Sequence, residues 1–171
     1  MHVIDAIRER RSIRSFLDKP IPKEKLEKIL DAGRRAPSAN NKQPWKFVVV
    51  LDQEMRKELA DASKYQEFVG EAPAVITAIA LNPDYVMSCG VPGYACDISI
   101  ALDHMMLAAV EEGLGTCWIG AFYQKTVKRI LGIPEKYKVA ALLPIGFPAE
   151  SPEPACRKSL EQVICYEHFT E

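Results

Sequence analysis

The longest helical pattern in the chain is the run YACDISIALDHMMLAAVEE at residues 94–112. Its side chains are apolar almost all the way round, and a helix of that kind needs other elements to cover it. Gly113 and Gly115 follow directly and predict where the helix ends. Charged residues interrupt the apolar stretches before they reach the roughly 18 residues that a membrane span requires. The run therefore predicts a central helix buried in a layered core.

The other patterns supply elements that could cover this helix. Apolar stretches at 45–52 and 72–81 predict buried strands, and 138–148 predicts a third strand that ends at Pro144. A chain of 171 residues that is 48% apolar fits one compact domain, residues 1–171. Helices and strands alternate too irregularly for a doubly wound sheet, so the fold class predicted is α+β. The further expected elements are helices at 3–10, 20–33, 54–63 and 123–133, a short strand or turn at 116–120, loops at 34–44, 82–93 and 147–155, and a turn with a terminal strand at 159–169.

Basic residues gather at the start of the chain. Residues 1–46 hold 12 Lys and Arg against 6 Asp and Glu, whereas the rest holds 10 against 17. Within IRERRSIRSF (7–16), an extended exit from the first helix would point Arg10, Ser12 and Arg14 the same way, as a clamp for a phosphate monoester. The alternative is a solvated basic face paired with Glu9. The net charge of −1 argues against a nucleic-acid binder.

Three other segments carry candidate binding groups. The loop APSANNKQPW (36–45) offers uncharged amides that could read the edge of a heterocycle, or it is a plain polar turn. In GLGTCWIG (113–120) a tryptophan replaces the third glycine of a dinucleotide fingerprint, and the segment follows a helix, so that fold is excluded. Gly120 could let a flat ligand approach the backbone, or the segment is a helix stop and a buried strand. Arg157 and Lys158 could complete a phosphate clamp or form a surface pair.

No catalytic side-chain machinery is recognisable. The three histidines are scattered, no GxSxG motif occurs, and the five cysteines contain no CxxC pair that would indicate a zinc site or a redox dithiol. Polar groups that bind and orient without an acid–base pair are typical of proteins in which a cofactor supplies the reactivity. No signal peptide pattern follows Met1, and we expect reduced thiols and a cytoplasmic location.

Four segments, in this order along the chain, resemble the FMN-dependent nitroreductase family: RERRSIRSF, APSANNKQPWKFVVV, AAVEEGLGTCWIGAF and LLPIGFPAESPEPACRKSLEQVI. The resemblance covers nearly the whole chain and marks it as a small member. It implies a nitroreductase-like α+β fold, with a central mixed sheet flanked by helices, that forms an intertwined homodimer. Two FMN molecules would lie at the dimer interface, and the apolar C-terminal VICYEHF would lie on the partner.

The resemblance also assigns site residues. The segment that would contact the flavin phosphate and ring edge consists of Arg10, Arg11, Ser12 and Arg14, and the C-terminal cations that would contact the phosphate are Arg157 and Lys158. The loop that would reach the flavin from the other subunit consists of Pro37, Ser38, Ala39 and Asn40. The segment that would lie along the ring consists of Trp118, Ile119 and Gly120, and the amide of Gln66 would lie near the ring.

The function implied is an FMN-dependent oxidoreductase. NAD(P)H would donate hydride to the flavin, and a small acceptor such as a nitroaromatic or a quinone would take the electrons in a ping-pong cycle. No side chain is expected to act as acid or base. The alternatives are an enzyme of the same fold dedicated to one substrate and a flavin-binding module without turnover. No metal, nucleic-acid or membrane partner is expected.

Overall fold

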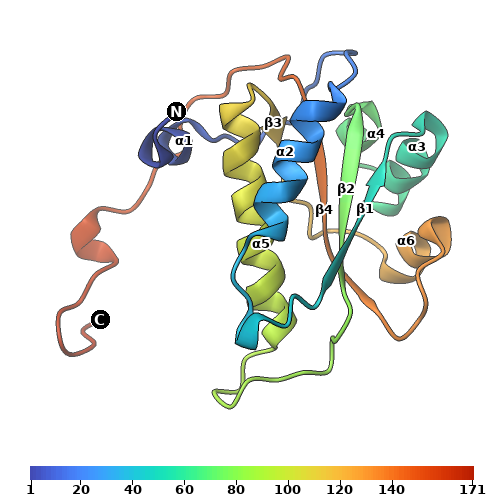
Figure 1. The fold of residues 1–171 in the computed structure, drawn as a ribbon. Helices are drawn as coiled ribbons and strands as arrows, with labels where there is room; N and C mark the ends of the chain where they lie inside the picture. The colour runs from blue at the N-terminus through green and yellow to red at the C-terminus, as the bar shows by residue number, and fades with distance from the viewer.

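The computed structural model describes residues 1–171, and these form three layers (Figure 1). A four-stranded sheet with the order β1-β2-β4-β3 lies in the middle. Helices α2 and α5 cover one face, and α3, α4 and α6 lie on the other side. The elements are α1 (Val3–Glu9), α2 (Lys23–Arg34), the 3-10 turn η1 (Ala39–Asn41), β1 (Trp45–Val50), α3 (Gln53–Ala62), α4 (Phe68–Glu71), β2 (Ala74–Ala80), α5 (Gly93–Glu111), β3 (Gly115–Thr116), α6 (Gln124–Leu131), β4 (Lys138–Gly146) and the 3-10 turn η2 (Leu160–Gln162).

Strand β2 shows why the sheet needs two covering layers. All seven of its residues are buried, and successive side chains of a strand point to opposite faces. Ile76 and Ala78 join the core beneath α2 and α5, whereas Val75 and Ile79 join the core beneath α3 and α6. A continuous apolar strand is therefore the sequence signature of a sheet covered on both faces.

Helix α5 has the central place that its sequence predicts. By length and composition alone it could cross a membrane. In the structure its inner side, including Leu102, Met105 and Ala109, is fully buried against the sheet and α2. Its outer side keeps apolar groups such as Ile100 partly exposed, at 37%. Helix α5 therefore has one face that the rest of the chain covers and one apolar face that it leaves uncovered.

Three expectations about the strands are wrong. The named strands pair only antiparallel, so the sheet is not mixed, and the one parallel contact is an isolated bridge between Ser12 and Thr116. Pro144 does not end β4, which runs on to Gly146. A proline has no N–H to donate, but the carbonyl of Pro144 still accepts a hydrogen bond from the N–H of Cys117. Strand β1 is an edge strand and only half-buried, not buried throughout.

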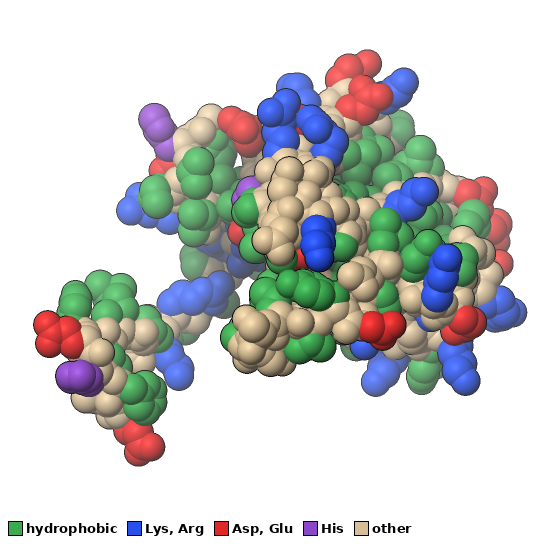
Figure 2. Space-filling model, turned by 60° about the horizontal axis from the view of Figure 1, so that its bottom comes forward, with side chains coloured by type: hydrophobic (Ala, Val, Ile, Leu, Met, Phe, Trp, Pro, Cys, Tyr) green, Lys and Arg blue, Asp and Glu red, His purple; other side chains and the backbone are tan.

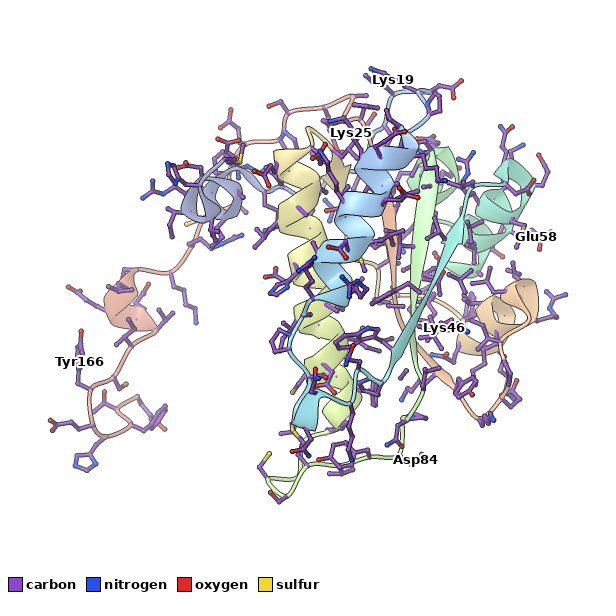
Figure 3. All side chains as sticks on the ribbon, in the orientation of Figure 1. Lys19, Lys25, Lys46, Glu58, Asp84 and Tyr166 are labelled. Carbon is purple, nitrogen blue, oxygen red and sulfur yellow. The ribbon has the colours of Figure 1, made fainter.

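The C-terminal tail, residues 150–171, leaves the body of the molecule. It forms no terminal strand, only the turn η2, and every residue from Ser151 onward is exposed except the half-buried Pro152. Figure 2 shows the end of the tail as a separate lobe, and Figure 3 shows Tyr166 well away from the layers. Tyr166 and Phe169 are 86% and 84% exposed. The tail thus leaves large apolar side chains uncovered by its own chain.

Candidate functional site

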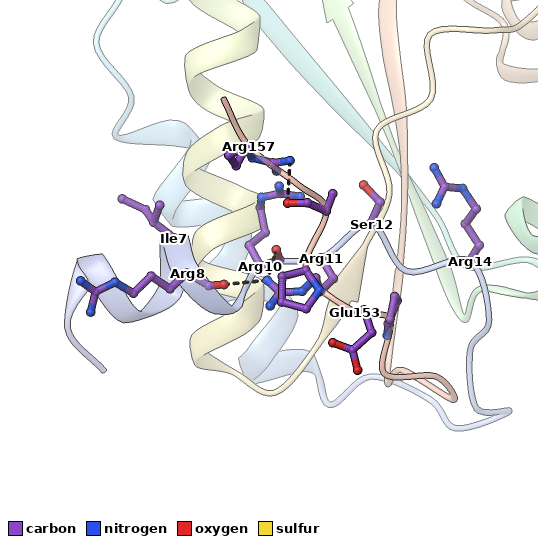
Figure 4. Close-up of a pocket in the computed structure, with 11 residues that line it drawn as sticks. Ile7, Arg8, Arg10, Arg11, Ser12, Arg14, Glu153 and Arg157 are labelled. Atoms are coloured by element: carbon purple, nitrogen blue, oxygen red, sulfur yellow. Dashed lines mark hydrogen bonds between the residues drawn. The ribbon is translucent and has the colours of Figure 1, made fainter. Parts of the chain in front are cut away.

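The N-terminal arginines line a cavity of about 510 Å³ between the end of α1 and the beginning of the tail (Figure 4). Arg10, Arg11, Ser12 and Arg14 lie on its N-terminal side, and Arg157 approaches from the tail. The remaining lining residues are Ile7, Arg8, Pro152, Glu153, Pro154 and Ala155. The cavity therefore brings together guanidinium groups that are almost 150 positions apart in the sequence. Lys158 is not among the lining residues and lies exposed in the tail.

The arginine segment is extended rather than helical. Helix α1 ends at Glu9, and Arg10 has backbone angles of φ −55° and ψ 127°. The chain is then fixed to β3, because Ser12 bridges Thr116 and the N–H of Ile13 donates to the carbonyl of Thr116 at 2.9 Å. Gly115 permits this approach, since a Cβ there would overlap the Ile13 side chain. Of the two arrangements open from the sequence, the structure has the extended exit.

The arginine side chains of this segment differ in their hydrogen bonds. Arg11 donates from one terminal nitrogen to the carbonyls of Arg8 at 2.6 Å and Arg10 at 2.9 Å, and so holds the last turn of α1. Its Nε is buried without a partner. The side chains of Arg10 and Arg14 make no hydrogen bond or ion pair in the chain, and Glu9 pairs with neither. Two guanidinium groups are thus left free beside the cavity.

Acidic groups at the start of the tail complete this region, and sequence reasoning missed them. Glu150 accepts a hydrogen bond from the backbone N–H of Arg14, and Glu153 lines the cavity. Arg157 donates to the carbonyls of Ala155 and Cys156 at 3.4 and 3.3 Å. The Glu150 bond thus joins the start of the tail to the arginine segment, whereas the Arg157 bonds stay within the tail. Acidic residues so near a basic segment in space but not in sequence leave no local signal.

The segment after β3 runs beside the arginine segment. Ile119 is buried and pairs with Leu142 of β4, whereas Trp118 remains 37% exposed. A Cβ added to Gly120 would meet nothing closer than the Trp118 indole nitrogen, at 3.9 Å. Burial raises the pKa of the Cys117 thiol, and nearby Arg14 opposes that shift more weakly. The segment thus offers an open backbone stretch flanked by an indole, with a protonated thiol behind it.

Gln66 is fixed against this segment. Its side-chain amide donates to the carbonyls of Ser63 at 2.7 Å and Ala121 at 3.3 Å. The turn that carries it includes Lys64 and Tyr65, both left-handed at φ 56° and 59°. Such conformations are uncommon for residues other than glycine and indicate a turn held by its surroundings. The structure therefore places Gln66 next to Ala121, the residue that follows Gly120.

The loop 37–40 lies apart from the arginine cavity. The N–H of Ala39 donates to the Asp97 carboxyl at 3.0 Å, near the start of α5, while the N-terminus of Met1 reaches Glu111 at its end. At 1.5 Å per residue, Asp97 and Glu111 are about 21 Å apart along the helix. Figure 1 shows η1 and α1 at opposite ends of α5. The candidate residues thus form two groups within one chain.

The loop has its own internal support. The Ser38 hydroxyl accepts a hydrogen bond from the Gln43 N–H at 2.9 Å. Asn40, Asn41 and Gln43 are left-handed, at φ 53°, 55° and 51°. Asp97, which anchors the loop, was not identified from the sequence. A carboxyl group in the second turn of an otherwise apolar helical pattern was the available signal, since an acid is rarely buried without a specific task.

Comparison with known proteins places this geometry in a family. The model described as "Nitroreductase family" matches residues 7–81 and 62–147. A putative NADH dehydrogenase/NAD(P)H nitroreductase of Methanothermobacter thermautotrophicus is 35% identical over 162 residues, which cover 89% of this chain and 80% of that protein.

Solved structures are also similar. A nitroreductase family protein from Clostridium novyi NT has a TM-score of 0.83 and 40% identity, with 91% of this chain and 89% of that chain covered. The NADPH:FMN oxidoreductase from Vibrio harveyi, solved with NAD+, has a TM-score of 0.90 and 30% identity, with 99% of this chain and 78% of that chain covered. The matched segments include the arginine segment, the loop 37–40 and the stretch after β3, and the chain belongs to the nitroreductase family.

Proposed function

We propose that this protein is an FMN-dependent oxidoreductase that takes electrons from NAD(P)H and delivers them to a small acceptor. The observation that carries the proposal is the arginine cavity, where the side chains of Arg10 and Arg14 make no hydrogen bond or ion pair in the chain. Relatives named for the same activity are the FMN reductase [NAD(P)H] of Bacillus subtilis and the NADPH-flavin oxidoreductase of Vibrio harveyi. When bound, FMN supplies the redox chemistry, accepting hydride from the nicotinamide and returning electrons to the acceptor.

The residues present fit a flavin phosphate. A phosphate monoester carries close to two negative charges, and guanidinium groups bind it through paired, charge-assisted hydrogen bonds. Arg10, Arg14 and Arg157 would hold the phosphate, with the Ser12 hydroxyl as a further donor. Arg11 is already engaged with backbone carbonyls and would contribute mainly its charge and its free Nε. Lys158, outside the cavity, would act only as a distant counter-charge.

The neighbouring segment suits the flat ring. Trp118, Ile119 and Gly120 would lie along it, because Gly120 leaves the backbone open on one side. Gln66 would present its amide oxygen to the ring edge while its nitrogen stays bonded to Ser63 and Ala121. Backbone N–H groups and a cation near the ring would stabilise the negative charge that reduction places on it. No side chain is assigned the role of acid or base.

The second group of candidate residues leads us to propose a homodimer. Pro37, Ser38, Ala39 and Asn40 cannot reach the arginine cavity of their own chain along the length of α5, so they would contact the flavin held by the partner. Two surfaces that the single chain leaves uncovered are available for the contact. One is the outer side of α5, and the other is the apolar tail with Leu160, Val163 and Ile164 at 70%, 62% and 40% exposure.

The free edge of β1 is the natural place for the partner's tail. An open groove of about 490 Å³ runs between α2 and β1, and Leu30, Trp45 and Phe47 are among its lining residues. Unpaired N–H and C=O groups along an edge strand can accept another strand. We propose that the segment 163–169 of the partner covers this edge.

The cysteines form no disulfide, which supports a cytoplasmic location.

The first experiment is a visible absorption spectrum of the purified protein, followed by release and identification of any chromophore. We expect flavin bands and release of FMN on denaturation. The protein should then oxidise NADH or NADPH with a nitroaromatic or quinone acceptor. A colourless protein that fails to bind added FMN contradicts the proposal. FMN binding without NAD(P)H oxidation identifies a flavin-binding module, and one strongly preferred acceptor identifies a dedicated enzyme.

A further inference from the structure

Asp97 is the only acidic residue among the buried residues, at 4% exposure. One carboxyl oxygen accepts the N–H of Ala39 at 3.0 Å, and the other is buried without a partner. Burying a carboxyl group is unfavourable unless hydrogen bonds compensate it, and one backbone N–H is little compensation. A residue that only filled space in this apolar helix would be better as leucine or alanine. The position of Asp97 therefore calls for a role outside packing.

The turn η1 lacks a cap of its own. Its N-cap residue is Ser38, but the Ser38 side chain makes no capping hydrogen bond to the turn, because its hydroxyl accepts from Gln43 instead. The first N–H groups of any helical turn need acceptors from elsewhere. Asp97 supplies one for Ala39 across 58 positions of sequence, and the adjacent N–H of Asn40 has no backbone acceptor. The second carboxyl oxygen of Asp97 has no partner in the chain.

The same turn is conformationally demanding. Asn40 and Asn41 are consecutive left-handed residues, a conformation that persists only where the surroundings impose it. Without a tether from the core, the loop would relax to other shapes. Asp97 sits on α5, whose packing against the sheet and α2 makes it rigid. The carboxyl group thus transfers the rigidity of the central helix to the loop.

We propose that Asp97 is a positioning residue that holds the loop 37–40 in the shape that contacts the flavin of the partner subunit. This inference rests on the proposed function. Its carboxyl group caps η1 from a distance through the N–H of Ala39. Asp97 touches neither flavin nor acceptor. Its effect on the reaction passes entirely through the loop.

The test compares Asp97→Ala and Asp97→Leu, which remove the acceptor, with Asp97→Asn, which keeps one. The control is Asp61→Asn, an exposed carboxyl group on α3. We expect at least a tenfold weaker FMN dissociation constant for Asp97→Ala and Asp97→Leu and recovery to within about threefold for Asp97→Asn, since one lost hydrogen bond to a charged group is worth about that factor. The melting temperature of the flavin-free protein should stay within a few degrees, because the burial cost of the carboxyl group is removed as well.

Amide hydrogen exchange of the flavin-free protein tests the hydrogen bond between Asp97 and Ala39 independently of activity. Exchange at Ala39, whose N–H donates to Asp97, should quicken in Asp97→Ala and Asp97→Leu, while exchange in β1 stays unchanged. Visible circular dichroism of bound FMN should also change in these variants, which a purely structural role would not cause.

The outcomes separate the two proposals. Unchanged exchange at Ala39, or unchanged FMN affinity in whichever of the acceptor-free variants folds, overturns the role of Asp97. A parent protein that binds no FMN overturns the proposed function instead, and the exchange measurement still tests the tether.

Discussion

Ser12 and Thr116 form a single parallel bridge, and this pairing joins the arginine segment to the strand β3 that leads into Trp118–Gly120. Beside this bridge, the Ile13 side chain packs closely against Gly115. The pairing thus holds the two segments side by side, and the distance between the proposed phosphate contacts and the proposed ring contacts is set by backbone pairing. A flavin needs such a fixed spacing, because its phosphate and its ring are joined by a chain of fixed length.

Loss of a guanidinium from the cavity should weaken FMN binding without loosening the fold. Arg10→Ala and Arg14→Ala each remove a charged donor worth about 1.5–3 kcal/mol, or about tenfold to a hundredfold in affinity. Neither side chain has a partner in the chain, so the melting temperature of the flavin-free protein should not fall. Fluorescence titration with FMN measures the effect. Arg129→Ala, at an exposed position on α6, is the control, and full affinity in both cavity variants would contradict the clamp.

Removal of the tail beyond Ser159 should separate the subunits. The deletion takes away Leu160, Val163, Ile164, Tyr166 and Phe169, none of which packs on its own chain. We expect sedimentation to show a monomer whose circular dichroism keeps the helices and the sheet. Arg157 is retained, so weaker flavin binding would report the loss of the partner's loop and not of the cavity. A truncated chain that stays dimeric rules out the tail as the main contact.

Two glycines near the proposed ring site should respond in opposite ways. Gly115→Ala drives a methyl group into Ile13 and should cost about 1–3 kcal/mol of stability, as overpacking does. Gly120→Val places its side chain in open space, and its backbone is not left-handed, so stability should hold. The valine should nevertheless obstruct the ring. Chemical unfolding paired with FMN titration distinguishes the two, and an equal loss of stability in both would contradict the open face at Gly120.

Glu112 should make stability depend on acid pH. Lys28 and then Lys25 donate hydrogen bonds to its carboxyl group and hold its pKa below the usual 4.5. A lowered pKa stabilises the fold fully above 4.5, and that contribution disappears as the pH falls through the folded-state value. Glu112→Gln should therefore lower the melting temperature at pH 7, and this effect should shrink as the pH falls below 4.5 toward the folded-state pKa. Glu58→Gln, exposed on α3, should show no such difference.

Most helices and strands could be predicted because their signals are local. The continuous apolar run of β2 follows from its burial on both faces of the sheet, and the long apolar pattern of α5 marks it as a core helix. Helix α4, only four residues long, carries too short a pattern to be recognised. Pro144 misled because a proline usually ends a strand, whereas its carbonyl can still pair here. The expected terminal strand has no partner within the chain, and strands form only by pairing.

The residues of the candidate site could likewise be predicted only where their signals are local. The basic composition of the N-terminal segment indicated an anion site, and the structure gathers Arg10, Arg11, Ser12, Arg14 and Arg157 at one cavity. The roles of Glu150 and Asp97 depend on contacts across 136 and 58 positions. Only Asp97 left a signal in the sequence, as an acid within an apolar helical pattern. That the loop 37–40 lies at the far end of α5 is likewise a property of the folded chain alone.

The pairing of the N-terminal segment also dictates an order of events during biosynthesis. The carbonyl of Thr116 and that of Phe147 are the acceptors for Ile13 and Leu17, and Ala149 donates to Ser15. A nascent chain on the ribosome has made its basic segment long before these partners emerge, and Arg157 comes later still. The first residues synthesised must therefore wait, unpaired, for nearly the last ones. Under the proposed function, FMN would then load only after translation, because a chain interrupted before Arg157 lacks part of the cavity.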